Sequence, residues 1–273
     1  MGTLMSRERS RVPDLLQCYL KYREVIQAWR GTGDISIDLP FLQPTTLLPL
    51  WAEAEHNHVQ LVALNSEVRE YIDALTKGAC IPAGGTYLPP VRLPRTHSEA
   101  GAVTRQLSDL SRQTRIFQAN PNVFDYVLSE LIDNIYQHAH AEVAFALAQY
   151  YPRKKEIEIG FLDNGVTIPG SLERGTELRF PPELHYQAVL NAMDGSSSKG
   201  GTERGYGLGT SLELMTQLEG SGLIVSGQGA IFLSGDQRQP FALSKEERMP
   251  GTLISIQLPD GDKKINLYDV VGR

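Results

Sequence analysis

SELIDNIYQHA, at residues 129–139, spaces its apolar residues like a helix but also carries carboxylates, amides and an imidazole. Its polar residues Glu130, Asn134 and His138 are four positions apart, so a helix would place them on one face, each one turn beyond the last. Taken alone, this pattern also fits the solvent-exposed face of an ordinary helix. Its meaning therefore depends on the motifs that accompany it along the chain.

The composition limits the classes of protein to which the chain can belong. A length of 273 residues, 41% of them hydrophobic, predicts one large or two modest domains with a real core. The net charge of -6 argues against a nucleic-acid partner, and no apolar run is long enough to span a membrane. The first residues lack the apolar stretch of a signal peptide. Cys18 and Cys80 are too few for a disulfide framework or a zinc site, which favours reduced thiols in a cytoplasmic protein.

The first part of the chain predicts a small α/β unit. Its last helix is expected to start with Asn65 or Ser66 as N-cap and to stop at Gly78. Two strands joined through a helix are expected to pair in parallel. The expected elements are a helix at 14–29, a strand at 34–39, a helix at 45–56, a strand at 59–64 and a helix at 65–78.

A break between two parts is expected at residues 78–95, GACIPAGGTYLPPVRLPR. Its four prolines and paired glycines are unfavourable in a helix or a central strand, so the stretch is interpreted as a linker or as a loop packed over the second domain. We therefore expect a small N-terminal unit with its linker at 1–95 and a second domain at 96–273.

The second part predicts an α+β fold. Its helices and its several, largely antiparallel strands suggest a mixed sheet covered by helices on one face. The expected helices are at 98–117, at 129–139, near 183–193 and from Thr210, and the expected strands are at 156–162, 222–227, 229–234 and 252–258.

Two further motifs accompany the polar helix. Asp163-Asn164-Gly165 follows an expected strand, where alone it indicates only a turn. Residues 194–214, DGSSSKGGTERGYGLGTSLEL, place glycines before a helix, so that backbone amides and the helix N-terminus can approach an anion. The dinucleotide fingerprint would need a strand directly before the glycines, and the P-loop signature is absent. A flexible glycine loop without a ligand is the alternative.

Taken in order, these motifs resemble the GHKL superfamily of ATP-binding domains, which comprises gyrase, Hsp90, histidine kinases and MutL. ELIDNIYQHA resembles the N-box, DNGVTIP the G1 box and RGYGLGTSLEL the G2 box, while GTLISIQLP resembles the last conserved strand. The resemblance covers roughly residues 100–260. It implies a Bergerat-type ATP-binding fold that binds ATP and Mg²⁺.

The resemblance also implies roles for individual residues. Asn134 would be the magnesium ligand, and Glu130 would activate water or orient the nucleophile. His138 would lie along the phosphate path, Asp163 would accept a hydrogen bond from the adenine amino group, and Gly165 would keep the turn beside the base open. The family's next glycine of the G1 box is replaced here by Thr167, which bears on the hinge of the lid more than on the adenine contact. The remaining nucleotide-binding residues implied are Lys199, Arg204, Gly205, Gly207, Leu208 and Gly209 of a mobile lid, and Thr252 of the last strand.

The resemblance leaves the activity open. A histidine kinase needs a phosphoacceptor His followed at once by an acidic residue, whereas His97 is followed by Ser98. One class that remains is an ATPase or a serine or histidine protein kinase that acts on a separate protein partner in signalling. The other is a nucleotide-gated interaction or partner-switching module with little or no catalysis. The N-terminal unit is faintly similar to STAS-type modules, and an extension or an oligomerisation unit that forms a homodimer is the alternative.

Overall fold

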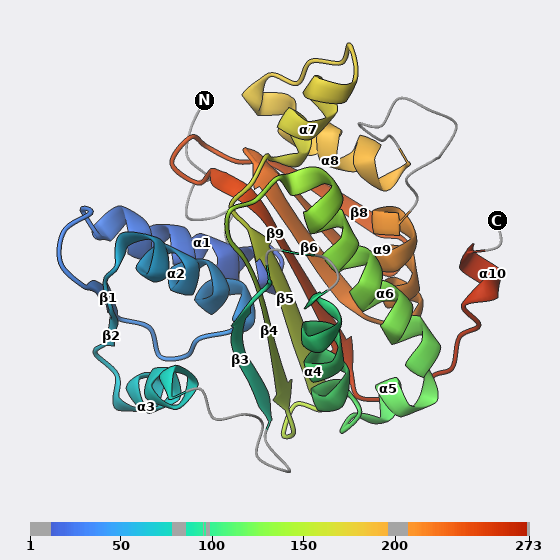
Figure 1. The fold of residues 1–273 in the computed structure, drawn as a ribbon, viewed down its shortest axis with the longest axis horizontal. Helices are drawn as coiled ribbons and strands as arrows, with labels where there is room; N and C mark the ends of the chain where they lie inside the picture. Colours follow the sequence, from blue (N-terminus) through green and yellow to red (C-terminus); the bar gives the residue numbers. More distant parts are fainter. Residues whose placement is uncertain (1–11, 78–85, 95, 97–98, 196–206, 272–273) are drawn as a thin grey trace.

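The computed structural model describes residues 12–77, 86–94, 96, 99–195 and 207–271. Within them the fold is α+β, as predicted: seven strands form one antiparallel sheet, with helices on both faces (Figure 1). The strands lie in the order β3 (Tyr87–Arg92), β4 (Ala144–Tyr151), β5 (Glu156–Asp163), β9 (Met249–Pro259), β6 (Ser221–Gly227), β7 (Gly229–Ser234) and β8 (Gln237–Ala242).

The N-terminal unit has the predicted helix–strand–helix–strand–helix order. Its two short strands pair in parallel, with Ile35 opposite Leu61, which confirms the predicted pairing. The side chain of Asn65 accepts hydrogen bonds from two backbone N–H groups of the last helix, so Asn65 is the N-cap. The elements are α1 (Asp14–Ala28), β1 (Ile35–Ile37), α2 (Pro44–Asn57), β2 (Leu61–Ala63) and α3 (Ser66–Thr76).

One face of the large sheet is covered by helices of the second part of the chain. Its core is built mainly by α4, α6 and α9, which pack on the strands (Figure 1). The elements are α4 (Gly101–Ser111), α5 (Arg115–Ala119), α6 (Pro121–Asn134), the π-helix η3 (Ile135–Ala139), α7 (Ile168–Gly175), the 3-10 helix η4 (Pro182–Leu184), α8 (His185–Met193), α9 (Gly207–Gln217) and α10 (Tyr268–Val271).

The helices of the second part cover one face, as predicted, but the opposite face is covered by the N-terminal unit, and the prediction of a mixed sheet is wrong. The sheet is antiparallel, and α1 and α2 pack against its second face (Figure 1). Strand β4 shows the reason, because its successive side chains are buried on alternate sides: Ala146 in the core below α6, and Phe145 and Leu147 in the core below α1 and α2. Strands buried on both faces are continuously apolar rather than alternating.

The prediction of a linker is wrong for residues 87–92. These residues form β3, which pairs with β4 at the edge of the sheet. An edge strand tolerates proline because one side of its backbone has no neighbouring strand. The register shifts between Leu88 and Val91, at Pro89 and Pro90. A strand from the first part of the chain thus belongs to the sheet of the second.

A buried carboxylate joins the N-terminal unit to the sheet. Glu158 of β5 is 0% exposed, and its Oε1 accepts hydrogen bonds from the backbone N–H (2.9 Å) and the hydroxyl (2.7 Å) of Thr45. Thr45 lies in the first turn of α2, whose N-cap residue Gln43 makes no side-chain capping bond. Glu158 therefore supplies the cap from another part of the chain.

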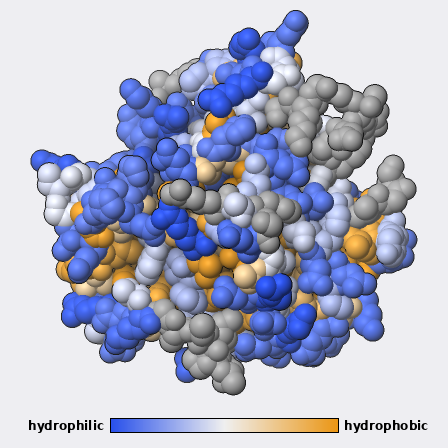
Figure 2. Space-filling view, in the orientation of Figure 1, coloured by the Kyte–Doolittle hydropathy of each residue, from blue (hydrophilic) through white to orange (hydrophobic). Residues whose placement is uncertain are grey.

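The surface in Figure 2 is largely hydrophilic, and some apolar residues show over the N-terminal unit, at the left. Phe41, Val62 and Leu64 of this unit are exposed. No helix among the described residues combines the length and the apolar character needed to cross a membrane.

Candidate functional site

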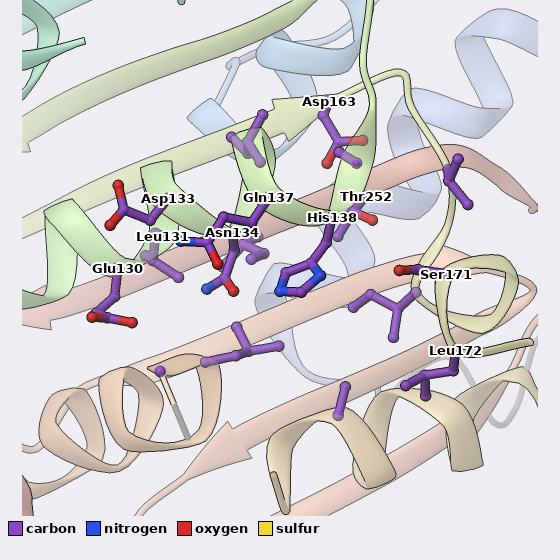
Figure 3. A pocket seen from close by; sticks show the side chains of 18 residues that line it. Glu130, Leu131, Asp133, Asn134, Gln137, His138, Asp163, Ser171, Leu172 and Thr252 are labelled. Carbon is purple, nitrogen blue, oxygen red and sulfur yellow. The ribbon is translucent and has the colours of Figure 1, made fainter. Parts of the chain in front are cut away.

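A cavity of about 170 Å³ lies where the central strands end, between α6 and the beginnings of α7 and α9 (Figure 3). Its walls are largely apolar, with polar side chains from α6, η3, β5 and β9. The polar and glycine lining comprises Glu130, Asp133, Asn134, Gln137, His138, Asp163, Ser171, Gly207 and Thr252, and the apolar lining includes Leu131, Ile135, Val166, Ile168, Leu172, Leu208 and Ile254.

The polar helix ends differently from the prediction. Helix α6 stops at Asn134 and continues as a π-helix, so His138 lies on a wider turn than an α-helix would give. Glu130, Asn134 and His138 still project from the same side, toward the cavity (Figure 3). Single π-turns within helices occur frequently at functional sites. The π-turn ends at His140, which adopts the left-handed conformation with φ 48°.

The turn after β5 packs directly on the end of this helix. The backbone N–H of Val166 donates to the Ala139 carbonyl oxygen at 2.6 Å. A Cβ placed on Gly165 would lie only 2.1 Å from that same oxygen. Glycine is therefore required by close backbone contact, and this contact places Asp163 beside the helix.

Asp163 is the most buried carboxylate of the cavity, with 4% of its surface exposed. Its Oδ1 accepts the backbone N–H of Gly165 at 2.9 Å, and Thr252 lies directly opposite on β9. Burial raises the pKa of Asp163 from 3.8 to about 7, although backbone hydrogen bonds from Gly165 and Thr252 act in the other direction. The group can therefore hold or release a proton near neutral pH.

Glu130 lies at the other end of the cavity, against the first residue of α9. A Cβ on Gly207 would lie 2.0 Å from Glu130 Oε2, so the glycine lets the carboxylate approach the helix. Burial, and then the charge of Asp133, raise the pKa of Glu130.

The side-chain nitrogen of Asn134 is available to a hydrogen-bond acceptor. It is buried and has no hydrogen-bond partner among the described residues. Within that part of the chain, no three His, Cys, Asp or Glu side chains are grouped to hold a metal ion.

The structure brings most of the expected site residues to one cavity and leaves others elsewhere. Gly165 supports the turn, and Gly209 packs on α8, because its Cβ would lie 1.9 Å from the Met193 carbonyl oxygen. Lys199, Arg204 and Gly205 lie outside the described residues. The expected residues that line the cavity are Glu130, Asn134, His138, Asp163, Gly207, Leu208 and Thr252.

Several lining residues were not expected from the sequence. Ile168 and Leu172 come from α7, a short helix whose apolar residues at i and i+4 could have indicated it. Ser171 lies on the same helix, between them, and faces the cavity (Figure 3). No local signal marks Ile254, which reaches the cavity through the register of β9.

Comparison with protein-family models, with curated proteins and with solved structures finds no match to this chain. The class of protein is therefore defined by the fold and the site alone. It is an α+β protein whose central antiparallel strands end in a largely apolar cavity with one deeply buried carboxylate and, toward α9, an available amide and a second carboxylate.

Proposed function

We propose that the cavity binds an adenine nucleotide together with magnesium, as the resemblance to GHKL ATP-binding domains implies. The observation that carries the proposal is the convergence of three distant motifs on one cavity. Glu130 and Asn134 come from the first, Asp163 from the second and Gly207 from the third. The cavity separates a buried, apolar end from a polar end, as a molecule with a flat base and a charged tail requires.

Asp163 would recognise the base. As a carboxylate it accepts a hydrogen bond from the exocyclic amine of adenine, whereas guanine presents a carbonyl oxygen there and leaves the acceptor unpaired. Ile168 and Leu172 of α7 would cover the base from one side. The apolar lining would exclude water, which would make the polar contact with Asp163 more selective.

The phosphates would lie toward Glu130 and the beginning of α9. The N-terminus of a helix favours anions through its free N–H groups and its dipole. Asn134 would ligate magnesium, which offsets the repulsion between the phosphates and nearby carboxylates. Glu130 would orient water or another nucleophile, since a raised pKa makes a carboxylate a stronger base.

The chemistry that fits this arrangement is ATP hydrolysis, or phosphoryl transfer to a separate protein, in a cytoplasmic signalling protein. One observation favours the second candidate, a nucleotide-gated interaction module with little catalysis. The hydroxyl of Tyr19 on α1 donates to the backbone oxygen of Glu247 at 2.6 Å, in the loop that leads into β9. The N-terminal unit thus contacts the strand that carries Thr252.

Calorimetric titration with ATP and with GTP, each with and without magnesium, tests base recognition. We expect tighter binding of ATP, and Asp163→Asn should weaken it by about fivefold or more, the value of one hydrogen bond. Asp133→Asn is the matched control, because it removes a carboxylate at the other end of the same cavity and should leave the preference for ATP over GTP unchanged. Equal affinity for the two nucleotides in the unmodified protein would refute the proposal.

Two variants of the helix separate binding from turnover. Asn134→Ala should abolish the effect of magnesium on ATP affinity. Glu130→Gln should leave binding largely intact and lower the release or transfer of phosphate, because a general base acts mainly in the transition state. Unchanged turnover in Glu130→Gln would remove the catalytic role, and no turnover in the unmodified protein would favour the interaction module.

A further inference from the structure

The hydroxyl of Ser226 is buried next to two residues that line the cavity, Ile168 and Thr252. Ser226 lies on β6 and is 0% exposed. It stands directly opposite Thr252 of β9, which stands directly opposite Asp163 of β5. Directly opposed residues of antiparallel strands project to the same face. Three polar side chains therefore form a row across adjacent strands, and two of them, Asp163 and Thr252, line the cavity (Figure 3).

Three polar atoms lie within hydrogen-bond distance of this hydroxyl. Ser226 Oγ accepts the backbone N–H of Ile168, the first residue of α7, at 2.8 Å, and it donates to the carbonyl oxygen of Gly251 at 3.2 Å. The Thr252 hydroxyl lies 3.0 Å away. Ser226 has one proton and gives it to only one oxygen, so the bond to Gly251 makes Thr252 the donor to Ser226, whereas a bond to Thr252 would leave the Gly251 oxygen without this donor. The acceptor positions of the Thr252 oxygen are then available to a ligand in the cavity.

The backbone around Ser226 is built to hold this geometry. The register between β6 and β9 shifts after the Ser226–Thr252 pair, so that Gly227 pairs with Met249. Gly251 lies in this irregularity, and a Cβ on it would lie 1.9 Å from the Asp163 backbone oxygen. Bulges of this kind re-aim side chains and are common beside active sites.

We infer that Ser226 is a positioning residue for base recognition, acting through Thr252. By accepting a hydrogen bond from the Thr252 hydroxyl, Ser226 leaves the Thr252 oxygen as an acceptor beside Asp163. The edge of the base then meets two acceptors rather than an acceptor and a donor. The ligand class selected is a purine with a primary amine at C6, which offers two N–H donors where guanine has a carbonyl oxygen. Ser226 also holds the first residue of α7 in place, because it accepts the backbone N–H of Ile168. The inference rests on the proposed function.

The test measures the affinity of ATP and of purine riboside triphosphate, which lacks the exocyclic amine. In Ser226→Ala the Thr252 hydroxyl loses its acceptor, so its proton can turn toward the cavity and oppose the amine of the base. We therefore expect ATP to bind about fivefold to tenfold more weakly, the value of one hydrogen bond. The affinity of the analogue should change by less than about twofold. A merely structural role would weaken both ligands equally, and that result would overturn the inference.

Thr252→Val supplies a second route that keeps the shape of the side chain. It should lower ATP affinity as Ser226→Ala does, and the double variant should lose no more than either single variant, because the two hydroxyls act in one chain. Additive losses would overturn the inference.

Ser255→Ala is the matched control. Ser255 lies on β9, is 0% exposed and has no hydrogen-bond partner for its hydroxyl among the described residues. It should leave both affinities unchanged. If the unmodified protein binds neither ligand, the proposed function fails and this inference falls with it. If the unmodified protein prefers ATP and Ser226→Ala retains that preference in full, only the inference about Ser226 fails.

Discussion

Replacing Glu158 with glutamine should make the stability of the protein less dependent on pH. The carboxylate is completely buried between β5 and α2, and among the described residues only its Oε1 has hydrogen-bond partners, both on Thr45. Burial raises its pKa from 4.5 to about 7, while the hydrogen bonds from Thr45 act in the other direction. Glutamine keeps an acceptor for Thr45 and cannot ionise.

The sign and size of the effect follow from the two pKa values. The folded protein holds the Glu158 proton more tightly than the unfolded chain does, so the contribution to stability is fully present below pH 4.5 and is lost as pH rises through about 7. At about 1.4 kcal/mol for each pH unit, the loss is about 3 kcal/mol. The Glu158→Gln variant should therefore gain stability relative to the unmodified protein by about this amount between pH 4.5 and 8.

Urea unfolding at pH 5, 6, 7 and 8, followed by the fluorescence of Trp29 and Trp51, measures this difference. Comparing the two proteins at each pH cancels the titration of every other carboxylate and any constant cost of the buried amide. Glu156→Gln, on the same strand, is the control. A constant difference between Glu158→Gln and the unmodified protein at all four pH values would refute the reasoning, as would the same slope in the control.

Three further outcomes are expected. ATP should bind about tenfold more weakly at pH 6 than at pH 8, because the acceptor form of Asp163, with its pKa near 7, is lost; titration calorimetry measures this, and Asp163→Asn should show no such change. Gly165→Ala should destabilise the fold by about 1–3 kcal/mol through its contact with the Ala139 oxygen, whereas Gly101→Ala should be close to neutral in the same thermal unfolding. Asn65→Ala should cost about 1 kcal/mol through loss of the α3 cap, measured by urea unfolding.

The N-terminal unit could be predicted because its signals are local. Helix α3 has one apolar face and a capping residue, Asn65, which bonds to the N–H groups two and three positions on. The strand β1 alternates between buried and exposed residues. Such patterns depend on near neighbours, so they survive without knowledge of the rest of the fold.

The second face of the sheet could not be predicted from the same kind of signal. Strand β4, AFALAQYY, is buried over most of its length and has no alternation. Small alanines face one core while Phe145 and Leu147 face the other, so the division appears only once both layers are in place. The edge strand β3 was hidden by its prolines, which are unfavourable in a central strand but acceptable at an edge.

The residues of the candidate site also fall into those that could be predicted from local sequence and those that could not. The motifs around Glu130, Asp163 and Gly207 were found because each is a short run of unusual residues, and their order supplied the rest. Ser226 carries no such mark, since LIVSG is an ordinary strand sequence. Its importance arises from the register that places it opposite Thr252, and register is set by the whole sheet.

The central strands connect the two halves of the molecule. Strand β5 carries Glu158 toward the N-terminal unit and Asp163 toward the cavity, on opposite faces because the two positions differ by an odd number. Strand β9, its neighbour, begins next to the loop whose Glu247 is bound by Tyr19 and then presents Thr252 to the cavity. A displacement of α1 or α2 would therefore act on the same two strands that the proposed nucleotide would contact. Since packed interiors transmit strain rather than absorb it, we expect a change in the N-terminal unit to alter the affinity for the proposed nucleotide, and binding of that nucleotide would then act on the N-terminal unit with the same free energy.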